Sequence, residues 1–407
     1  MGIKIFMISF IITSIPLIFL YISFSTEPAS ISITNFKPIL SSNNVLLKPT
    51  RDSYPVNFAY LISASKGDTK KLKRALLALY HPANHYLIHM DREAPEEEQR
   101  EVAEFVASEP VFSLVNNVYI VGKPNLVTYR GPTMLATTLH AMSMLLRCCK
   151  WDWFINLSAS DYPLVTQDGM VNLIHAFSEL PRDLNFIQHS SHLGWKLNKR
   201  AKPMIIDPAL YSLNKSEIWW VIKQRTLPSA FKLYTGSAWT ILSRSFAEYS
   251  IVGWDNLPRT LLLYYTNFVS SPEGYFQTVV CNSEDYKNTT VNHDLHYIAW
   301  DNPPKQHPRS LGPKDFRRMV LSSRPFARKF KQNNPVLDKI DRDLLKRHRR
   351  RYTYGGWCSE KGKKPEACSG FQSENYGVLR PGPGSRRLKN MLTKLLSGRN
   401  FTKRQCR

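Results

Sequence analysis

Apolar residues gather in short runs that alternate with segments of helical spacing through the first part of the chain. Four runs have the length and composition of buried strands: Phe58–Ile62, Tyr86–Met90, Val118–Val121 and Trp153–Leu157. Two further segments, Lys70–Tyr80 and Thr133–Leu146, have the spacing of amphipathic helices. Strands that alternate with helices predict parallel β-α-β units, with ligands bound at the carboxyl ends of the strands.

The second half of the chain is less regular. It contains Trp219–Trp220, the segment Gly236–Leu242 and a helix-like stretch at Glu273–Val280. Near the C-terminus, five apolar residues form one stripe of a short amphipathic helix: Leu388, Met391, Leu392, Leu395 and Leu396. We expect this helix to pack on the folded domain, and contact with a membrane is the alternative.

The longest apolar segment lies at the N-terminus, where Lys4 precedes an uncharged run from Ile5 to Phe24. About 20 apolar residues can span the hydrocarbon core of a bilayer, and a basic flank before the span favours a cytoplasmic N-terminus. A cleaved signal peptide is the alternative, but its apolar region has only about 7–15 residues. We therefore predict cytoplasmic residues 1–4, a signal anchor over 5–24, a stalk over 25–55, a folded lumenal domain over 56–357 and a basic extension over 358–407.

The composition and net charge of the chain indicate which chemical class of molecule it binds. The 407-residue chain has a formal net charge of +23, and 43% of its residues are hydrophobic. That hydrophobic fraction is enough for a packed core, so disorder is not expected outside the ends. The positive balance indicates an anionic partner. A lumenal location argues against nucleic acid, so phosphate-bearing or carboxylated substrates are favoured.

Six cysteines in an oxidising compartment can form disulfides. Cys358 and Cys368 are close together in a segment rich in Gly, Lys and Pro, where we expect a local disulfide. The pairing of the other four is left open: Cys148, Cys149, Cys281 and Cys406.

Glycosylation sequons occur at Asn214, Asn288 and Asn400, and we expect these sites to be available. A fourth sequon begins at Asn156. Because Asn156 lies in a strand-like apolar run, we do not expect it to be glycosylated.

Polar loops follow three predicted strands: Ser63–Asp68, Asp91–Glu93 and Ser158–Asp161. Acidic residues at strand ends suit hydrogen bonding to a nucleotide, whereas the alternative is that they only cap helices and form turns. Asp91–Arg92–Glu93 also resembles an acid-x-acid pattern that holds a divalent metal, but the intervening Arg92 argues against that role. Cations from the basic segment Lys305–Arg351 are another way to neutralise a diphosphate.

The segment Ser270–Phe276 carries the most suggestive carboxylate. Pro272 at the first position of the expected helix places Glu273 in the opening turn, beside the positive end of the helix dipole. A carboxylate there can take a proton from a sugar hydroxyl as a general base. The alternative is that Glu273 only decorates the start of a helix.

The order of the segments is itself informative: FAYLISASKGD, YLIHMDRE, VTYRGPTML, FINLSASDYPL, YTGSAWTILSRSF, SSPEGYFQTV and RPFARKF. This ordered set, which covers about residues 57–358, resembles glycosyltransferase family 14. That family includes core-2/I-branching N-acetylglucosaminyltransferases, peptide xylosyltransferases and a plant branch. The likeness is greatest to the plant branch, which includes β-glucuronosyltransferases that act on arabinogalactan-protein galactans.

The resemblance implies an α/β fold of the GT-A type with a central mixed sheet. It implies inverting transfer of glucuronic acid from UDP-glucuronate to β-linked galactan side chains of arabinogalactan proteins, without a divalent metal or other cofactor. It also implies a type II protein of the Golgi membrane that participates in cell-wall glycosylation. Transfer of xylose or N-acetylglucosamine is the alternative within the family, and a non-catalytic polysaccharide-binding protein is the alternative outside it.

The resemblance also assigns roles to individual residues. Glu273 matches the catalytic base, and Arg309 and Lys329 match the pair that contacts the donor diphosphate. Three residues are expected on the side of the UDP-sugar donor: Ser63, Asp91 and Asp161. Five residues are candidates for the substrate pocket: Gly236, Ser237, Trp239, Lys199 and Arg200.

Overall fold

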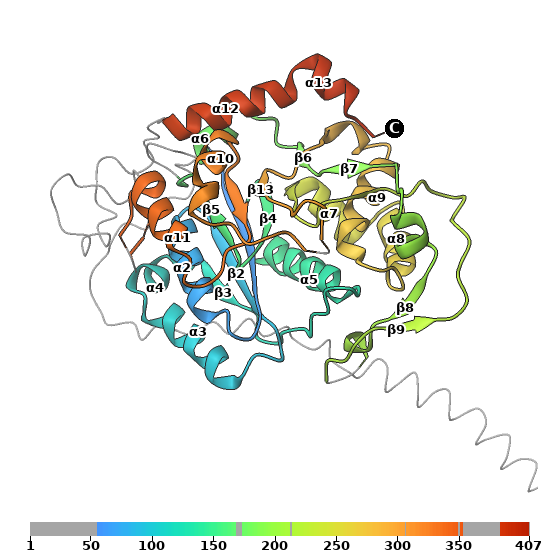
Figure 1. Ribbon diagram of the computed structural model, residues 1–407, viewed down its shortest axis with the longest axis horizontal. Helices are drawn as coiled ribbons and strands as arrows, with labels where there is room; N and C mark the ends of the chain where they lie inside the picture. The colour runs from blue at the N-terminus through green and yellow to red at the C-terminus, as the bar shows by residue number, and fades with distance from the viewer. Residues whose placement is uncertain are drawn as a thin grey trace, which may run out of the picture.

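The computed structural model describes residues 55–167, 173–211, 214–305, 307–348, 351–352 and 383–406. Its centre is a mixed sheet of seven strands in the order β12-β6-β11-β4-β1-β2-β3, covered by helices on both faces (Figure 1). The strands of this sheet are β1 (Phe58–Ala64), β2 (His85–Met90), β3 (Val118–Ile120), β4 (Trp153–Ser158), β6 (Asn185–Phe186), β11 (Ile241–Ser243) and β12 (Thr290–Val291).

The first half of the sheet is parallel, as its sequence pattern predicts. Strand β1 pairs in parallel with β2 on one side and with β4 on the other, and β2 pairs in parallel with β3. Strand β11 then pairs antiparallel with β4, which makes the sheet mixed. The predicted α/β fold with a central mixed sheet is therefore confirmed.

Two hydrophobic cores fill the two faces of the sheet, because alternate residues of a strand point to opposite sides. Phe58, Tyr60 and Ile62 belong to one core, whereas Ala59 and Leu61 belong to the other. The first core also contains residues of α2 (Thr69–Leu79), α3 (Glu96–Ser108), α4 (Pro110–Val115), α6 (Leu173–Ser178) and α12 (Pro383–Leu396). The second contains residues of α5 (Thr133–Cys148), α7 (Arg244–Val252), α8 (Leu257–Tyr265) and α9 (Tyr275–Asn282).

The prediction that a polar loop begins at Ser63 is wrong. Strand β1 continues to Ala64, and Ser63 lies in it opposite His89 of β2 and Ser158 of β4. Pairing on both sides extends the strand beyond its apolar run, because backbone hydrogen bonding does not require an apolar side chain. The other predicted strands and helices agree with the structure to within two residues at their ends.

Smaller elements surround the main sheet. A three-stranded sheet contains β5 (Asp161–Pro163), β13 (His296–Ile298) and β14 (Phe326–Arg328), with β14 in the middle. Two antiparallel pairs join β7 (His189–Ser190) to β10 (Thr235–Gly236) and β8 (Met204–Ile206) to β9 (Trp219–Val221). The remaining helices and turns are η2 (Leu197–Ala201), η3 (Pro208–Leu210), η4 (Ser271–Glu273), η5 (Lys287–Thr289), η6 (Pro313–Asp315), α10 (Phe316–Leu321), α11 (Pro335–Ile340), η7 (Asp341–Leu345) and α13 (Gly398–Lys403).

The amphipathic helix near the C-terminus packs on the domain, as predicted. Leu388 and Leu392 of α12 are buried in the first core, and Met391, Leu395 and Leu396 pack against it. Helix α12 lies beside α6 along one edge of the molecule (Figure 1). This arrangement follows from the apolar stripe, which would otherwise face water.

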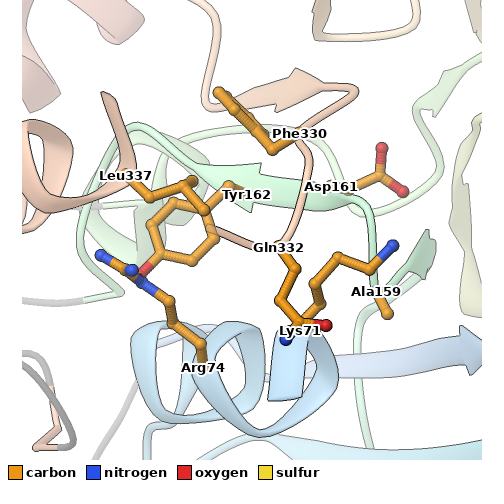
Figure 2. A pocket seen from close by; sticks show the side chains of 8 residues that line it. All are labelled: Lys71, Arg74, Ala159, Asp161, Tyr162, Phe330, Gln332 and Leu337. Carbon is orange, nitrogen blue, oxygen red and sulfur yellow. The ribbon is translucent and has the colours of Figure 1, made fainter. Parts of the chain in front are cut away.

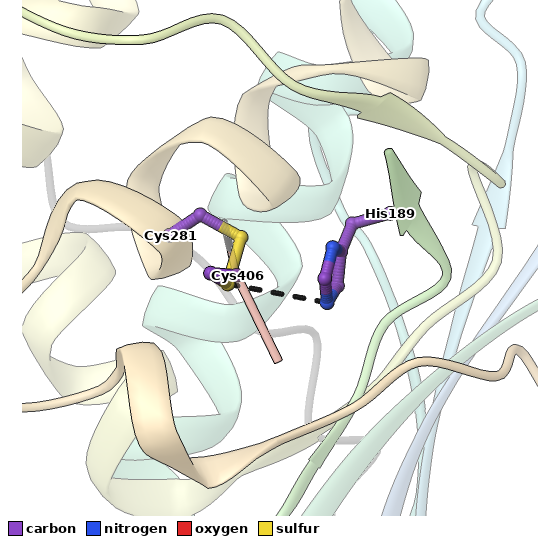
Figure 3. A group of neighbouring side chains, drawn as sticks. All are labelled: His189, Cys281 and Cys406. Carbon is purple, nitrogen blue, oxygen red and sulfur yellow. Dashed lines mark hydrogen bonds between the residues drawn. A yellow bond between two sulfur atoms is a disulfide. The ribbon is translucent and has the colours of Figure 1, made fainter. Parts of the chain in front are cut away.

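Two disulfides join the four cysteines whose pairing the sequence left open. Cys148 pairs with the adjacent Cys149, and Cys281 of α9 pairs with Cys406 after α13. His189 Nε2 lies 3.9 Å from Cys406 Sγ (Figure 3). This trio has the residue types of a metal site, but its two sulfur atoms are bonded to each other and so offer no thiolates.

Several predictions fall on residues outside the described ranges. The predicted disulfide between Cys358 and Cys368 is one, and the predicted anchor, residues 5–24, and most of the stalk are others. Within the described part of the chain, no helix is both long enough and apolar enough to cross a membrane. The domain boundaries at residues 55 and 357 stay predictions.

Candidate active site

The order of the strands in the sheet reverses at β1. The chain runs from β1 to β2 and β3 on one side and then returns to β4 on the other. In open α/β sheets, ligands bind outside the carboxyl ends of the strands at such a point. The loops at this point follow β1 and β4, and Lys71 of α2 connects them: its Nζ contacts Asp68 Oδ1 at 2.6 Å and Ser160 Oγ at 3.1 Å.

A small pocket lies beside these loops, with Lys71 and Arg74 contributed by α2 and Phe330 by the segment after β14 (Figure 2). Its other lining residues are Ala159, Asp161, Tyr162, Gln332 and Leu337. Arg74 is already committed to structure, because it forms ion pairs with Asp338 at 2.8 Å and Asp341 at 2.6 Å. Asp161 is the carboxylate among the residues that line this pocket.

Asp161 is buried at the start of β5, just after the end of β4, and is held from both sides. Its Oδ2 accepts hydrogen bonds from the backbone and the hydroxyl of Ser158, at 2.6 and 2.7 Å. The register of β5 and β14 places Arg328 directly opposite, with Nε 3.4 Å from Asp161 Oδ1. The guanidinium of Arg328 also lies 3.8 Å from the centre of the Trp239 ring. Thus Asp161 and Trp239, both predicted from the sequence, meet through an arginine that was not predicted.

The segment Gly236–Trp239 is fixed by two elements of the core. Gln277 of α9 donates to the Ser237 carbonyl at 2.6 Å, and Asn156 of β4 donates to the Ala238 carbonyl at 2.9 Å. Gly236 has to be a glycine, because a Cβ there would lie 1.7 Å from the Gln188 carbonyl oxygen. Asn156 is buried and bonded in this way, which agrees with the prediction that its sequon is not used.

Glu273 ends the short turn η4 and does not lie within a longer helix as predicted. Gly274 interrupts the helix, and α9 begins only at Tyr275. The turn is anchored from behind, because Ser271 Oγ donates to the Tyr265 and Phe268 carbonyls at 2.6 and 2.9 Å. The Glu273 side chain therefore projects from a turn that is hydrogen-bonded to the end of α8 and the segment after it.

Two cations and a phenol surround the Glu273 carboxylate. Arg200 Nη1 lies 2.5 Å and Lys196 Nζ 3.5 Å from Glu273 Oε2, and the charge of Glu273 also acts on the Tyr129 hydroxyl. We call these four residues the Glu273 cluster. Burial lowers the pKa of the Lys196 ammonium, against the effect of Glu273. Partial burial of the hydroxyl, followed by the charge of Glu273, raises the pKa of Tyr129.

The Glu273 cluster contains one of the two basic residues, Lys199 and Arg200, that were predicted for the substrate pocket. Lys196, which precedes η2, and Arg200 within η2 both contact Glu273, whereas Lys199 is exposed. The structure thus brings Arg200 to Glu273 and does not bring Lys199 there. The charge of Arg328, which pairs with Asp161, also acts on the Tyr129 hydroxyl.

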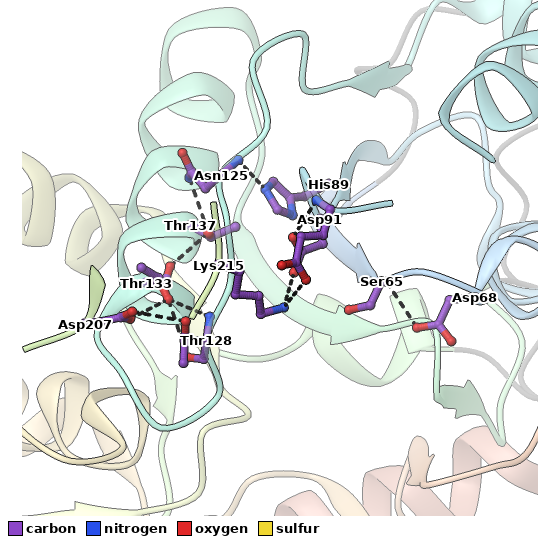
Figure 4. A network of polar contacts seen from close by, with 11 residues as sticks. Ser65, Asp68, His89, Asp91, Asn125, Thr128, Thr133, Thr137, Asp207 and Lys215 are labelled. Carbon is purple, nitrogen blue, oxygen red and sulfur yellow. Dashed lines mark hydrogen bonds and ion pairs between the residues drawn. The ribbon is translucent and has the colours of Figure 1, made fainter. Parts of the chain in front are cut away.

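A chain of buried polar contacts holds the loop that carries Tyr129 (Figure 4). Thr133 Oγ1 donates to Asp207 Oδ2 at 2.9 Å, and Thr128 Oγ1 donates to Asp207 Oδ1 at 3.1 Å. At the other end of the loop, the Asn125 backbone donates to His89 Nε2 at 3.0 Å. The acceptor role of Nε2 requires a neutral ring, and burial lowers the pKa of His89 to about 4.

Asp91, at the carboxyl end of β2, is almost completely buried and faces a lysine from a distant part of the sequence. Lys215 Nζ lies 3.1 Å from Asp91 Oδ2 and 3.3 Å from Glu93 Oε2 (Figure 4). Lys215 belongs to the connection between β8 and β9. Both acids of the acid-x-acid pattern noted in the sequence, Asp91 and Glu93, therefore form ion pairs with the Lys215 ammonium group.

Of the two cations predicted to contact a diphosphate, Arg309 lies in the connection between β13 and η6, and Lys329 follows β14. Arg309 uses both ends of its guanidinium to bind Asp315, at 2.8 and 2.5 Å. This hydrogen bonding raises the pKa of Arg309 and lowers that of Asp315. Lys329 directly follows β14 and is half-buried, with its carbonyl oxygen bonded to Leu311 N at 2.9 Å. Their contact with a diphosphate stays a prediction.

Four residues of the site were missed by sequence reasoning: Tyr129, Lys196, Lys215 and Arg328. Three of them lie in or beside segments that had been singled out, such as VTYRGPTML and RPFARKF. Lys215 had no such signal, because its partner Asp91 lies 124 residues earlier.

The three predicted sequons differ in their surroundings. Asn214 and Asn288 are exposed. The Asn400 amide donates to the Lys394 carbonyl and to Ser397 Oγ, both at 3.0 Å. Asn214 and Asn288 are therefore better placed than Asn400 to receive a glycan, and occupancy of all three stays a prediction.

Comparison with known proteins defines the family. The profile of the Core-2/I-branching enzyme family matches residues 58–320. The chain is 58% identical over 357 residues to beta-glucuronosyltransferase GlcAT14A of Arabidopsis thaliana, a match that covers 87% of this chain and 78% of that protein. It is 48% identical to beta-glucuronosyltransferase GlcAT14C of the same plant, over 93% of this chain and 92% of that protein. The chain belongs to the Core-2/I-branching enzyme family.

More distant similarities are also found. Human xylosyltransferase 2 is 31% identical over 71% of this chain and 34% of its own length. A solved structure of the galactosyltransferase LgtC matches 81% of this chain and 99% of its own with 10% identity, but at a TM-score of 0.29 it supports no conclusion. The family and the named relatives show that the chain is a glycosyltransferase, which confirms the resemblance read from the ordered motifs.

Proposed function

We propose that this enzyme transfers glucuronic acid from UDP-glucuronate to β-linked galactan side chains of arabinogalactan proteins. The donor is supported by relatives that are 48–58% identical and are named beta-glucuronosyltransferases. The galactan acceptor rests on the resemblance of the motifs to the plant branch. The positive net charge of +23 suits a donor that carries both phosphate and carboxylate groups.

The observation that carries the proposed chemistry is the Glu273 cluster. Glu273 is a carboxylate on a rigid turn, and 19% of its side chain is exposed. It lies beside the segment Gly236–Trp239, because the hydroxyl of the preceding residue, Thr235, donates to the Glu273 carbonyl at 3.1 Å. A general base needs this combination of a fixed position and access to the acceptor. Arg200 and Lys196 hold one carboxylate oxygen and so set the direction of the side chain.

In the reaction, Glu273 accepts the proton of an acceptor hydroxyl while that oxygen forms a bond to the anomeric carbon of the donor. The bond from the anomeric carbon to the diphosphate oxygen breaks, and the electron pair leaves with UDP. Attack from the face opposite UDP inverts the anomeric centre. Positive side chains must balance the charge that develops on UDP, and Arg309 and Lys329 are the proposed partners. No divalent metal is needed in this scheme.

We also propose that the protein is a type II protein of the Golgi membrane with its catalytic domain in the lumen. The apolar run from Ile5 to Phe24 and its basic flank support this topology. Two disulfides among the described residues are consistent with an oxidising lumen.

A donor screen tests the proposal. The purified protein is incubated with UDP-glucuronate, UDP-xylose, UDP-N-acetylglucosamine or UDP-galactose, and with β-1,3- or β-1,6-galacto-oligosaccharides. EDTA is present, and product mass is read directly. We expect the acceptor to gain the mass of one glucuronate when the donor is UDP-glucuronate, and no mass with the other three donors.

Other outcomes lead to different conclusions. Transfer of xylose or N-acetylglucosamine would keep the enzyme class but overturn the donor. Transfer that appears only when Mg²⁺ or Mn²⁺ replaces EDTA would overturn the metal-free mechanism. Binding of galactan without transfer from any donor would favour a polysaccharide-binding protein.

A further inference from the structure

Trp195 is a large aromatic residue that the domain leaves exposed directly beside the Glu273 cluster. It is 63% exposed. Its ring centre lies 5.2 Å from the guanidinium carbon of Arg200, which in turn forms an ion pair with Glu273. With Arg200 on one side of the ring, most of the remaining indole surface faces water. One charged side chain therefore separates an uncovered aromatic surface from the carboxylate.

The backbone around Trp195 is fixed, although its ring is not covered. Leu193 and Leu197, two residues before and after it, pack against the second core. The Leu197 N–H donates to the Gly194 carbonyl at 3.1 Å, and the Lys199 N–H donates to the Trp195 carbonyl at 3.2 Å. The indole is thus presented by a turn that is held on both sides. A group that is already fixed in this way loses less conformational entropy when it binds a ligand.

A second exposed aromatic residue, Tyr129, borders the Glu273 carboxylate from another segment. It is 47% exposed, and the charge of Glu273 acts on its hydroxyl. Its loop is bonded to the start of the Glu273 turn, because the Ser270 N–H donates to the Arg130 carbonyl at 2.8 Å. Aromatic surfaces beside a carboxylate suit a ligand that has both hydroxyl groups and apolar C–H faces, as a sugar does.

The exposed apolar surface continues along the chain from Trp195. More than half of the exposed large apolar side chains in the described part of the chain lie between residues 195 and 227. Strand β9 in this region carries Trp219 and Trp220, which are 62% and 53% exposed. The segment after β9 is tied to the end of η2, because Arg225 Nε donates to the Ala201 carbonyl at 2.9 Å. Exposed apolar residues that gather in one region mark a binding surface, whereas scattered ones do not.

A galactosyl unit has the kind of surface that an indole ring complements. Because its hydroxyl at C4 is axial, the C–H groups at C3, C4 and C5 form one apolar face. Stacking this face on the ring removes both surfaces from water and needs neither a charge nor a hydrogen bond. A nucleoside diphosphate would instead require cations. Trp195 is therefore suited to the acceptor glycan rather than to the phosphates of the donor.

We propose that Trp195 is a stacking platform for the galactosyl unit next to the one whose hydroxyl Glu273 deprotonates. The Arg200 guanidinium lies between the ring and the carboxylate, so the ring is set back from Glu273 and meets the neighbouring unit. Trp195 thereby selects galactan chains over single galactose units. The galactan in this inference rests on the proposed function, but the platform does not depend on which sugar the donor carries.

The test compares the wild type with Trp195→Ala and Trp195→Phe at saturating UDP-glucuronate. The acceptor is the galactotetraose, β-1,3- or β-1,6-linked, that the wild type uses better. We expect its KM to rise about 10- to 30-fold in Trp195→Ala and about threefold in Trp195→Phe, with kcat and the KM for UDP-glucuronate unchanged. Methyl β-galactoside, which lacks the neighbouring unit, should be used equally poorly by all three proteins.

A purely structural role gives a different result. If the ring only orients Arg200, Trp195→Ala should lower kcat and leave the KM for galactotetraose unchanged, and this outcome overturns the proposal. If thermal melting shows that Trp195→Ala is unfolded, Trp195→Phe decides, and an unchanged KM in that variant also overturns the proposal.

Trp254→Ala is the matched control. Trp254 is 60% exposed, lies in the connection between α7 and α8, and contacts the Tyr249 ring at 4.6 Å between ring centres. Its replacement should leave the KM for galactotetraose unchanged. An equal rise of that KM in Trp254→Ala and Trp195→Ala would overturn the proposal, because the effect would then not be specific to the side chain beside Arg200.

Calorimetric titration with galactotetraose in the absence of donor separates this inference from the proposed function. Transfer of another sugar, or of none, contradicts the proposed function, and the platform is still supported if Trp195→Ala raises the Kd for galactotetraose about tenfold or more. Equal affinity in the wild type and Trp195→Ala, or no binding to the wild type, overturns the platform and leaves the choice of donor untouched.

Discussion

The strand-end acids and the Glu273 cluster are held by different kinds of structure. Asp91 and Asp161 lie where β2, β4 and β5 pair with their neighbours, and backbone N–H groups bond directly to their carboxylates. Glu273 and Arg200 lie in single-turn helices, and they meet only through side chains. A strand end is fixed by many cooperative backbone bonds, whereas a one-turn helix has few.

Exposure differs in the same way. The carboxylates of Asp91 and Asp161 are 3% and 0% exposed, whereas the side chains of Glu273, Arg200 and Lys196 are 16–22% exposed. The strand-end side is thus preformed, and the Glu273 side can exchange its ion pairs for contacts with a substrate. The comparison teaches that substitutions on the Glu273 side should affect rate, and those on the strand-end side should affect stability.

Of the substitutions that test this comparison, Glu273→Gln is expected to have the largest effect on the transfer rate. An amide of the same size cannot accept the proton, so kcat should fall by about 10³-fold or more, whereas affinity for UDP and melting temperature should be unchanged. Initial rates, calorimetric titration with UDP and thermal unfolding measure the three quantities. Glu284→Gln, at a side chain 84% exposed, is the control. Weak UDP binding by a well-folded Glu273→Gln protein would contradict the assignment.

Arg200→Met should have the next largest effect. It removes the 2.5 Å ion pair that orients Glu273, so kcat/KM should fall by about 10- to 100-fold with little change in stability. Lys199→Met is the matched control, because Lys199 is the neighbouring residue of η2 and is exposed away from Glu273. Equal losses of kcat/KM in the two variants would show that only the net charge of this turn matters.

Gly131→Ala tests the loop between the two sides. A Cβ at Gly131 would lie 1.9 Å from Asp207 Oδ2, so the loop that carries Tyr129 must shift. We expect a loss of about 1–3 kcal/mol in the free energy of unfolding, measured with urea. Gly312→Ala is the control, because nothing lies within 4 Å of a Cβ there. Unchanged stability and rate in Gly131→Ala would mean that Asp207 moves freely, against its buried hydrogen bonds.

The smallest effect concerns pH and the strand-end side. The pKa of His89 is about 4 in the folded chain and about 6.5 when unfolded, so the unfolded chain binds more protons between these values. His89 therefore contributes full stability above about pH 6.5 and loses it as the pH falls toward 4, by about 1 kcal/mol at pH 5.5. Urea unfolding at pH 7 and 5.5 measures the loss.

His89→Gln should remove this part of the pH dependence, because a glutamine oxygen can accept from Asn125 without titrating. His189 and His293 also have pKa values lowered to about 4 by burial, so some pH dependence should remain. An unchanged slope in His89→Gln would assign the effect to the other histidines whose pKa values burial lowers: His140, His189, His293 and His296.

The sequence predicted the parallel half of the fold well, because buried strands and amphipathic helices have local periodicities. The packing of α12 on the domain was predicted for the same reason, because its apolar stripe is visible in the local sequence. Glu273 was found through the order of motifs, but its turn was not, since Gly274 breaks the expected helix. Lys215 and Arg328 could not be found, because each acts on an acid more than a hundred residues away and only strand register or tertiary contact brings them together.

The disulfide between Cys281 and Cys406 has a consequence for the order in which the protein matures. Cys281 lies in α9, the helix that begins two residues after Glu273, and its partner is made 125 residues later. At about 5–20 residues per second, a ribosome needs roughly 6–25 s to make that distance. During this interval α9 can pack on the domain, but its disulfide with Cys406 cannot yet form. The turn that carries Glu273 therefore passes through a stage in which Cys281 is reduced and accessible to cysteine-directed reagents on a nascent chain.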